Sequence, residues 1–288
     1  MKASLLTICC ILILFTGSSF QPKDDWTYLL DKNLSRWNIY QSFHHKLGYK
    51  GEAPKDANGN LIKPIGYNIN QDNVFSTMQE NGETVLHIDG DIYGCLFTKQ
   101  EFGNYDLKLK VKWGTHKYEP RLNEPKDSGV LYHSQGECGV EYWRTWMLSQ
   151  EFQVTEGGMG DYWTQASSRS DVKAVKKGKD YFFDNSGTLT AFGTGTGNGG
   201  FCHAGVDAEN KDGWNDLELI TYGDKSIRIV NGKVVMALSN SRYMLNGEAK
   251  PLVKGKIQIQ SEAAEVFYKD IKIKPISSIP AEYSTYFK

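Results

Sequence analysis

Apolar and polar residues alternate along much of the chain. In the segment YDLKLKVKW, from Tyr105 to Trp113, apolar side chains occupy every second position and lysines fill most of the positions between them. A period of two residues is typical of a β-strand with one buried and one solvated face. The pattern returns in WNDLELITY, residues 214–222, and in KIQIQ, residues 256–260. Shorter runs that also predict strands are ETVLHIDG, IYGCLFTK, SGVLYHS and QEFQVTE.

The segment SIRIVNGKVVMAL carries the strongest turn signal. Its two apolar runs flank Asn231-Gly232, a pair that accepts the positive φ angles of a tight β-hairpin. No segment has a convincing amphipathic helix pattern, and the best candidates for short helical turns lie between Asp72 and Gln79. The many short strands predict an all-β fold, a two-sheet antiparallel jelly-roll sandwich.

Two segments interrupt the strand pattern, residues 41–72 and residues 157–213. The second contains the glycine-rich run FGTGTGNGGF. We expect both to be long loops beside the functional face, since loops of this length in a compact domain usually serve function. The glycine-rich run lacks the strand-turn-helix context and the Gly-Lys-[Ser/Thr] of a phosphate-binding loop, which argues against nucleotide binding.

The first residues have the pattern of an export signal. Lys2 precedes an apolar run from Leu5 to Phe15, and small residues follow up to Ser19. Such a run is too short to span a bilayer and is typical of a secretory signal peptide. We therefore expect residues 1–19 to be removed. Residues 20–288 should form a single β-sandwich domain, exported to the bacterial periplasm or the extracellular space.

The charge balance limits the class of partner. Removing Lys2 from the 33 basic residues leaves 32 against 34 acidic ones. Proteins that bind nucleic acid normally carry a basic excess, so we expect no nucleic acid partner. An aromatic content of 12% instead suits an oligosaccharide or glycoside substrate, whose rings stack on flat side chains. No later segment is apolar enough for a membrane span.

Three cysteines remain after the signal segment: Cys95, Cys138 and Cys202. At most one intramolecular disulfide can form among three cysteines, and the sequence does not decide which pair would form it. Their spacing fits no zinc module.

Strand parity brings candidate catalytic side chains together. In QEFQV the apolar residues point to the core, so Glu151 and Gln153 share the open face. In DSGVLYHS the same alternation places His133 on the open face. If the two strands are neighbours, these three side chains line one pocket. A carboxylate beside an imidazole can transfer protons near neutral pH.

The segment EGGMGDYW follows this strand and adds polar and aromatic residues. We expect Asp161 and Trp163 at the rim of the pocket, where they would bind substrate together with Gln153 and Arg144. Glu156 and Asp161 could equally cap the glycine turn. A divalent cation is a candidate cofactor. Its candidate ligands are Glu151, His133, Glu156 and Asp161.

Several segments, in order, resemble one family over most of the chain. They are WTYLLDKNLSRWNIY, FGNYDLKLKVKW, DSGVLYH, EFQVTEGGMGDYW, WNDLELITYGDKSIRIVNGKVV and GKIQIQSEAAEVFYKDIKIKPI. They are similar to motifs of the 3-keto-disaccharide hydrolase family of bacterial polysaccharide-degrading loci. The resemblance implies a concanavalin A-like jelly roll and action on glycosides whose sugar is oxidised at carbon 3. Lys32 and Ser35 depart from the family's opening motif, and residues 164–213 are a less typical insertion, so substrate size could differ.

A ketone at carbon 3 acidifies the proton on carbon 2 and makes the glycosidic oxygen on carbon 1 a β-leaving group. Elimination followed by addition of water then gives net hydrolysis. This route needs a base, a stabiliser of the enolate and an acid for the leaving oxygen. We assign Glu151 as the base, His133 as the acid, and Gln153 as a donor to a hydroxyl or to the enolate. These roles are a physical assignment that the resemblance does not fix.

Two other functions fit the same residues. A noncatalytic, lectin-like carbohydrate-binding sandwich would have the same fold, because fold alone does not establish activity. An ordinary glycosidase would need a second carboxylate about 5–9.5 Å from Glu151. Glu141 and Asp161 are the candidates for that second carboxylate.

Overall fold

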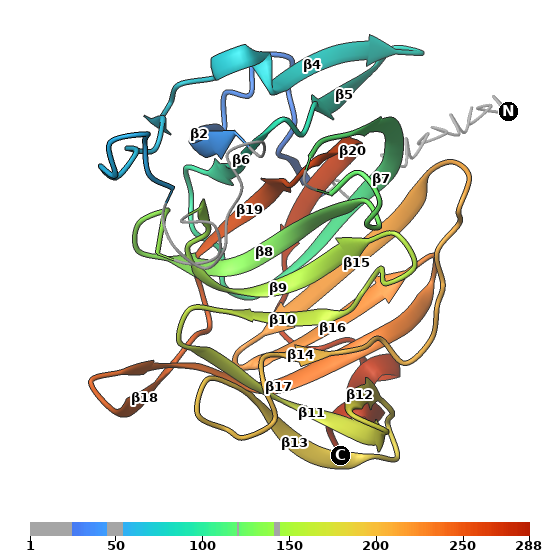
Figure 1. Ribbon diagram of the computed structural model, residues 1–288. Helices are drawn as coiled ribbons and strands as arrows, with labels where there is room; N and C mark the ends of the chain where they lie inside the picture. The colour runs from blue at the N-terminus through green and yellow to red at the C-terminus, as the bar shows by residue number, and fades with distance from the viewer. Residues whose placement is uncertain (1–24, 45–53, 120, 141–144) are drawn as a thin grey trace, which may run out of the picture.

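The computed structural model describes residues 25–44, 54–119, 121–140 and 145–288. They form two antiparallel β-sheets that lie face to face (Figure 1). Sheet A has the strand order β12-β11-β17-β16-β15-β7-β20-β5-β4, with β1, β13 and β18 paired at its margins. Sheet B has the order β14-β10-β9-β8-β19-β6-β2-β3. The predicted all-β sandwich is confirmed.

The strands of sheet A are β1 (Thr27–Tyr28), β4 (Phe75–Glu80), β5 (Glu83–Ile88), β7 (Tyr105–Lys117), β11 (Ser168–Lys177), β12 (Asp180–Phe183), β13 (Thr188–Gly193), β15 (Asn215–Tyr222), β16 (Lys225–Val230), β17 (Lys233–Leu245), β18 (Glu248–Pro251) and β20 (Ala264–Pro275). Those of sheet B are β2 (Trp37–His44), β3 (Gly66–Tyr67), β6 (Ile92–Thr98), β8 (Asp127–Gln135), β9 (Leu148–Thr155), β10 (Tyr162–Gln165), β14 (Phe201–Cys202) and β19 (Lys256–Ser261). Two 3₁₀ helices are described, η2 (Gln71–Asn73) and η3 (Ala281–Phe287).

The alternation read from the sequence explains how the sheets pack. In β7 the side chains of Leu107, Leu109 and Val111 are buried in the main core between the sheets. Phe152 and Val154 of β9 enter the same core from sheet B. Burying such side chains contributes about 1.5–3 kcal/mol each relative to exposure. The core therefore fixes which face of each strand remains available for a functional site.

The hairpin at Asn231-Gly232 joins β16 to β17 as predicted. Both residues have positive φ angles, 48° and 76°. This pair of left-handed residues is what a two-residue type I′ turn requires. The short helix η2 overlaps only the start of the region where helical turns were expected, and strand β4 occupies the rest from Phe75 onward.

The segment 157–213 is not the long loop that its glycines suggested. It contains β10, β11, β12, β13 and β14. In β11 the buried positions are mostly small or polar, as in Ser168, Ser170 and Ala174, so its alternation is weak in the sequence. The segment extends both sheets: β10 lies beside β9 and β14 beside β10, and β11 lies beside β17. Residues 45–53 of the other expected loop lie outside the described residues.

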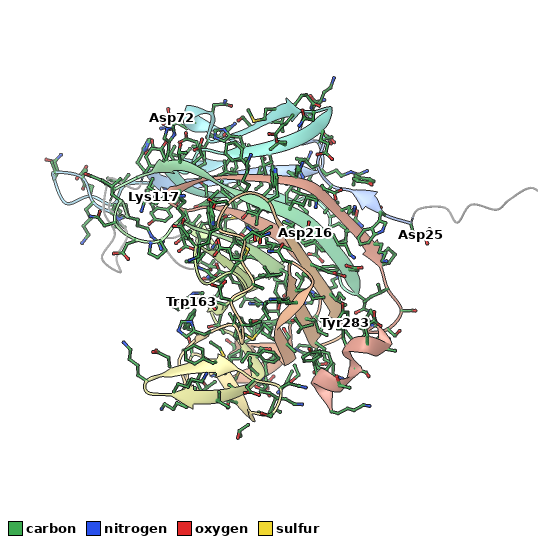
Figure 2. All side chains as sticks on the ribbon, turned by 90° about the vertical axis from the view of Figure 1, so that its right-hand side faces the viewer. Asp25, Asp72, Lys117, Trp163, Asp216 and Tyr283 are labelled. Atoms are coloured by element: carbon green, nitrogen blue, oxygen red, sulfur yellow. The ribbon has the colours of Figure 1, made fainter. Side chains whose placement is uncertain are left out.

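The outer face of sheet B, the face turned away from sheet A, carries a second apolar cluster. Its buried members are Tyr40, Tyr93, Cys95, Phe97, Leu131, Cys138, Trp146 and Met147. Figure 2 shows Trp163 on this side of the molecule, across the sheets from Asp216. No helix among the described residues is long and apolar enough to cross a membrane.

Candidate functional site

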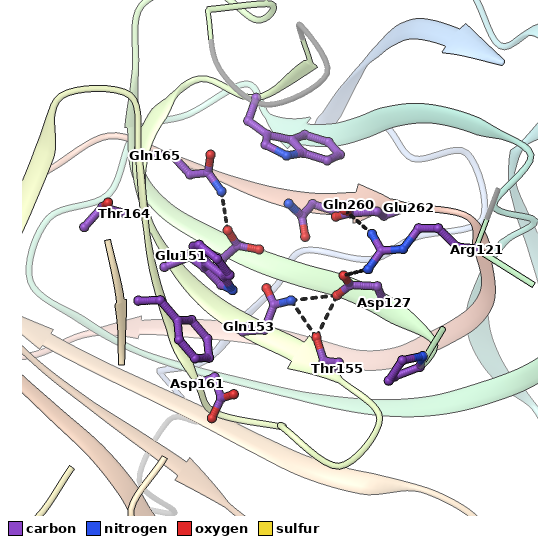
Figure 3. A pocket seen from close by; sticks show the side chains of 14 residues that line it. Arg121, Asp127, Glu151, Gln153, Thr155, Asp161, Thr164, Gln165, Gln260 and Glu262 are labelled. Atoms are coloured by element: carbon purple, nitrogen blue, oxygen red, sulfur yellow. Dashed lines mark hydrogen bonds and ion pairs between the residues drawn. The ribbon is translucent and has the colours of Figure 1, made fainter. Parts of the chain in front are cut away.

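A cavity of about 420 Å³ opens on the outer face of sheet B. Residues from β8, β9, β10, β14 and the end of β19 line it, together with the loop before β8 (Figure 3). The lining residues are Arg121, Pro125, Asp127, Trp146, Glu151, Gln153, Thr155, Asp161, Trp163, Thr164, Gln165, Phe201, Gln260 and Glu262. The volume lies within the range of small-molecule sites.

Glu151 lies at the floor of this pocket and is 2% exposed. Its neighbour Phe152 points into the core, so the extended backbone of β9 aims the carboxyl into the pocket, as parity predicted. The Gln165 amide on β10 donates a hydrogen bond to Glu151 Oε2. Burial raises the pKa of Glu151 to about 8, although Gln165 acts in the opposite direction. A carboxyl group with this pKa can exchange a proton near neutral pH.

Arg121 joins two further carboxyl groups at one end of the pocket. Its Nη2 lies 2.6 Å from Asp127 Oδ2 and its Nη1 lies 2.7 Å from Glu262 Oε1. Burial raises the pKa of both Asp127 and Glu262, and Arg121 opposes the rise. Glu151, Asp127 and Glu262 also repel one another electrostatically. The pocket therefore favours holding at least one acidic proton near neutral pH.

Several buried polar atoms in the pocket have no hydrogen-bond partner among the described residues. They are Trp146 Nε1, Gln153 Oε1, and both Gln260 Nε2 and Gln260 Oε1. Trp146 and Gln260 are 0% exposed and Gln153 is 7% exposed. A buried polar group without a partner costs about 1–3 kcal/mol. A ligand that brings both hydroxyl donors and oxygen acceptors would satisfy this set.

Gly129 on β8 leaves room for two of these side chains. An added Cβ would lie 2.6 Å from Glu151 Oε1 and even closer to Gln260 Oε1. Gly129 pairs with Gln153 of the neighbouring strand β9. The side chains of Glu151, from β9, and Gln260, from β19 on the other side, both lie next to it. A glycine is needed here because the two polar side chains lie over its Cα.

Aromatic rings form one wall of the pocket. Trp163 of β10 is 41% exposed and pairs across the ladder with Phe201 of β14. Their ring centroids are 4.6 Å apart at an interplanar angle of 44°. An exposed indole next to buried polar groups suits a ring that has one apolar face and hydroxyls at its edge. Trp163 thus lies at the rim, where the sequence placed it.

Asp161 lines the pocket and is held from two sides. The Ala204 amide donates to Asp161 Oδ1 at 2.7 Å, and His203 Nδ1 lies 3.2 Å from Asp161 Oδ2. Burial raises the pKa of Asp161, and these contacts oppose the rise. Its backbone oxygen accepts a 2.6 Å hydrogen bond from Arg228 Nη1. The carboxyl is therefore held by residues of the inserted segment, and the backbone of Asp161 is held by Arg228 of sheet A.

Arg228 is a charged residue buried in the main core between the sheets. It is 0% exposed, and its guanidinium lies 5.1–5.6 Å from the ring centroids of Tyr132, Phe152 and Tyr162. Its Nη2 lies 3.3 Å from the Tyr132 hydroxyl. This positive charge sits behind the strands that carry the pocket and lowers the pKa of Glu151 and Asp161 against the effect of burial.

The prediction that His133 shares the pocket is wrong. The pairing of β8 with β9 shifts between Tyr132 and Gln135, and His133 has a φ of 53°. This bulge turns the imidazole away from the pocket, where it packs against Tyr105 and contacts the carbonyl oxygens of Leu252 and Gly103 at 3.0 and 3.3 Å. Burial lowers its pKa to about 4. His133 is therefore a neutral structural residue at physiological pH.

Other predicted site residues have mixed outcomes. Gln153 lines the pocket, but its amide nitrogen already donates to Asp127 and Thr155, so only its oxygen is free to bind a ligand. Glu156 is exposed, lies 3.5 Å from Lys126 and does not line the pocket. Arg144 and Glu141 lie outside the described residues.

The predicted metal ligands do not converge. Glu151 and Asp161 line the pocket, whereas His133 faces the core and Glu156 lies outside. Within the described part of the chain, only His44, Asp72 and Asp91 bring three such ligand atoms within 4.8 Å of one another. None of these three lines the pocket. Among the described residues that line the pocket, no three such ligand atoms come this close together.

Sequence reasoning missed much of the pocket: Arg121, Asp127, Trp146, Gln165, Phe201, Gln260 and Glu262. Parity could have found two of them, because Asp127 alternates with Val130 and Tyr132 in β8, and Gln260 alternates with Ile257 and Ile259 in β19. Arg121 lies in a loop with no periodic signal.

Comparison with solved structures returns β-rich proteins at low similarity. A putative glycosyl hydrolase from Parabacteroides distasonis ATCC 8503 is 16% identical, with a TM-score of 0.47 over 88% of this chain and 94% of that chain. A β-glucanase from Bacillus licheniformis is 10% identical, with a TM-score of 0.42 over 87% and 97%. The carbohydrate-binding module CBM66 from Bacillus subtilis is 7% identical, with a TM-score of 0.38 over 69% and 91%. No curated protein matches the chain significantly.

A family model provides the decisive comparison. It matches residues 25–274, which include all the described residues that line the pocket. Membership supports a carbohydrate-active protein. The chain belongs to the family described as the 3-keto-alpha-glucoside-1,2-lyase-like domain.

Proposed function

We propose that the protein cleaves the glycosidic bond of 3-keto-glycosides or 3-keto-disaccharides by elimination, followed by hydration. Glu151 is the base that removes the proton on carbon 2. The observation that carries the proposal is a buried carboxyl with a pKa of about 8 in a pocket with unpartnered donors and acceptors. Glu151 has no imidazole beside it among the pocket-lining residues, so the proposal rests on the carboxyl itself.

The other roles follow from the donors and acceptors that remain free. Trp146 Nε1 and Gln260 Nε2 are available to donate to the oxygen on carbon 3, where negative charge develops as the proton leaves. Gln153 Oε1 is available to accept a hydroxyl hydrogen of the sugar. Burial beside other acids favours the protonated form of Glu262, which makes it the candidate acid for the leaving oxygen.

The proton count closes with these groups. Glu151 takes the proton from carbon 2, the carbon–oxygen bond at carbon 1 breaks, and the leaving oxygen receives a proton from the acid. Ionised Glu262 then takes a proton from water as the water oxygen adds to carbon 1 of the unsaturated ketone. Glu151 returns its proton to carbon 2, so both carboxyl groups regain their starting states. No step requires a metal ion.

An ordinary two-carboxylate glycosidase is the second candidate. Asp127 and Glu262 place additional carboxyl groups in the pocket with Glu151, which is the minimum equipment for acid and base catalysis of acetal hydrolysis. This alternative predicts cleavage without the ketone.

The deciding experiment compares a glycoside with its 3-keto counterpart. We expect product only from the 3-keto compound, with the unsaturated ketone or its hydrated form detected by mass spectrometry. A chelator should leave turnover unchanged, because none of the proposed steps uses a metal ion. Equal cleavage of both substrates would replace the elimination by the glycosidase mechanism, and binding of both without cleavage would indicate a carbohydrate-binding module.

Gly129→Ala tests the pocket floor. The added methyl would displace the Glu151 and Gln260 side chains, whose ends move easily, so the fold should persist. We expect turnover of the 3-keto substrate to fall by about 10²-fold, as for a displacement of about 1 Å at reacting groups. Gly103→Ala is the matched control, because its Cβ would meet Lys254 and Val253 at an ordinary 3.5 Å. Similar activity of the two variants would show that Gly129 is not needed for chemistry.

We also propose that the protein acts after export and loses residues 1–19, a segment outside the described residues. The apolar run after Lys2 supports this proposal. The N-terminal sequence of protein isolated from a host envelope tests it, and an intact Met1 would count against export with cleavage.

A further inference from the structure

Two of the three cysteines described in the structure lie side by side. Cys95 Sγ on β6 and Cys138 Sγ, in the loop after β8, are 3.9 Å apart. The two residues are 0% and 8% exposed. Cys202 is buried elsewhere, in the main core, and its Sγ lies 3.7 Å from the carbonyl oxygen of its neighbour His203. The structure thus selects one pair where the sequence left three choices open.

The surroundings of the pair suit a cross-link. Both cysteines belong to the apolar cluster on the outer face of sheet B, together with Trp146. Formation of a disulfide requires the sulfur atoms to approach from 3.9 Å to about 2 Å. Cys138 lies in a loop, so side-chain rotation and a small loop shift can supply this movement. Loss of the Cys95 thiol hydrogen leaves Gln258 Oε1 with another donor, the Met147 amide at 3.4 Å.

We propose that Cys95 and Cys138 form a structural disulfide that fastens the loop after β8 to β6. The oxidant is a disulfide-bearing compound, either a small disulfide or a thiol–disulfide oxidoreductase. The thiolate of Cys138, the more exposed cysteine, attacks the oxidant and releases one of its thiols. Cys95 then displaces the second thiol. The two cysteines lose two hydrogens in total, and the oxidant disulfide gains them as two thiols.

The cross-link also bears on the pocket wall. Val140 N donates to the Trp146 carbonyl at 3.2 Å, and Gly139 N donates to the Thr145 carbonyl at 3.2 Å. The residues directly after Cys138 are thus hydrogen-bonded to the segment that contains Trp146, and Trp146 lines the pocket. Closing a loop across 43 positions in the chain removes freedom from the unfolded state and stabilises the folded one.

The test treats the full-length protein with oxidised glutathione and digests it under non-reducing conditions. We expect mass spectrometry to find one peptide pair linked through Cys95 and Cys138. Adding a reductant should lower the Tm by about 5–10 °C.

Variants separate the cross-link from packing. Cys138→Ala should abolish the response of the Tm to reductant, whatever its own Tm, because only the response reports the disulfide. Cys202→Ala is the control and should keep the response. Cys95→Ser is a second route to the same result if Cys138→Ala folds poorly. Free Cys95 and Cys138 after oxidation, linkage of either one to Cys202, or a Tm that does not respond to reductant would each overturn the proposal.

Discussion

Replacing Glu151 by Gln is expected to lower turnover of a 3-keto-glycoside by about 10²–10⁴-fold, the usual contribution of a general base. The amide preserves the shape of the side chain and can still accept the Gln165 hydrogen bond, so substrate binding should change much less. In the unchanged protein the rate should rise with pH through about 8, because only the ionised carboxylate acts as a base. Steady-state kinetics across this pH range provides the measurement.

The same variant should be more stable than the parent at alkaline pH. Burial raises the folded-state pKa of Glu151 from 4.5 to about 8, so the folded protein holds a proton that the unfolded chain releases. Stability therefore falls as pH rises from about 4.5 to 8, by a few kcal/mol. Gln cannot ionise, so Glu151→Gln should gain that difference at pH 8 and little at pH 4 in urea unfolding.

Phe152→Leu is the matched control on the core side of the same strand. It removes packing without a polar group, so it should cost stability with little selective loss of turnover. Near-normal turnover of Glu151→Gln would move the base elsewhere in the pocket, with Asp161 as the next candidate. A variant with unchanged pH-dependence of stability would contradict the raised pKa.

Arg121→Met is expected to cost about 3–5 kcal/mol of unfolding free energy near neutral pH, because it leaves the negative charge shared by the buried Asp127 and Glu262 without its cation. Asp127 and Glu262 are both buried, at 6% and 4% exposure, and Arg121 contacts each of them. The loss should shrink as pH falls, since both carboxyl groups have raised pKa values and become neutral on protonation. Urea unfolding at neutral pH and at about pH 5 measures the difference.

A compensated variant isolates the electrostatic cause. Arg121→Met combined with Asp127→Asn and Glu262→Gln removes the cation and both acids together. We expect it to recover much of the lost stability, since complete replacement of a buried charge cluster is often close to neutral. An equal loss at both pH values, or no recovery in the combined variant, would show that Arg121 acts through packing of its aliphatic part.

The alternation of apolar and polar residues predicted the architecture because most strands have one apolar, buried face and one polar face. The lysines of β7, the Asn231-Gly232 turn and the inward Phe152 are all short-range signals. The inserted strand β11 escaped prediction because its buried positions are small or polar. Its neighbours also include glycines that suggest loops. Strand assignment fails where the buried face is not apolar.

The sequence predicts the site only where side chains alternate regularly between the two faces of a strand. Glu151 and Gln153 were placed correctly because β9 is regular up to its end. His133 was misplaced because a bulge in β8 reverses the alternation, and no residue pattern marks that bulge. Arg121 and Glu262 are 141 positions apart in the chain, so only the folded sheet brings them together. Such long-range contacts define most of the pocket's electrostatics.

Arg228 is a buried positive charge whose electric field acts on the pocket, and dissolved ions cannot reach it. Surface pairs such as Lys110 and Asp216 are in contact with solvent, so counterions screen them over a Debye length of about 8 Å at physiological ionic strength. Arg228 is sealed among aromatic rings, where no counterion can enter. Its lowering of the pKa of Glu151 should therefore be the same at low and high ionic strength. The midpoint of the pH–rate profile should move little with salt. The proton chemistry of the pocket would then depend on the fold and not on the surrounding electrolyte.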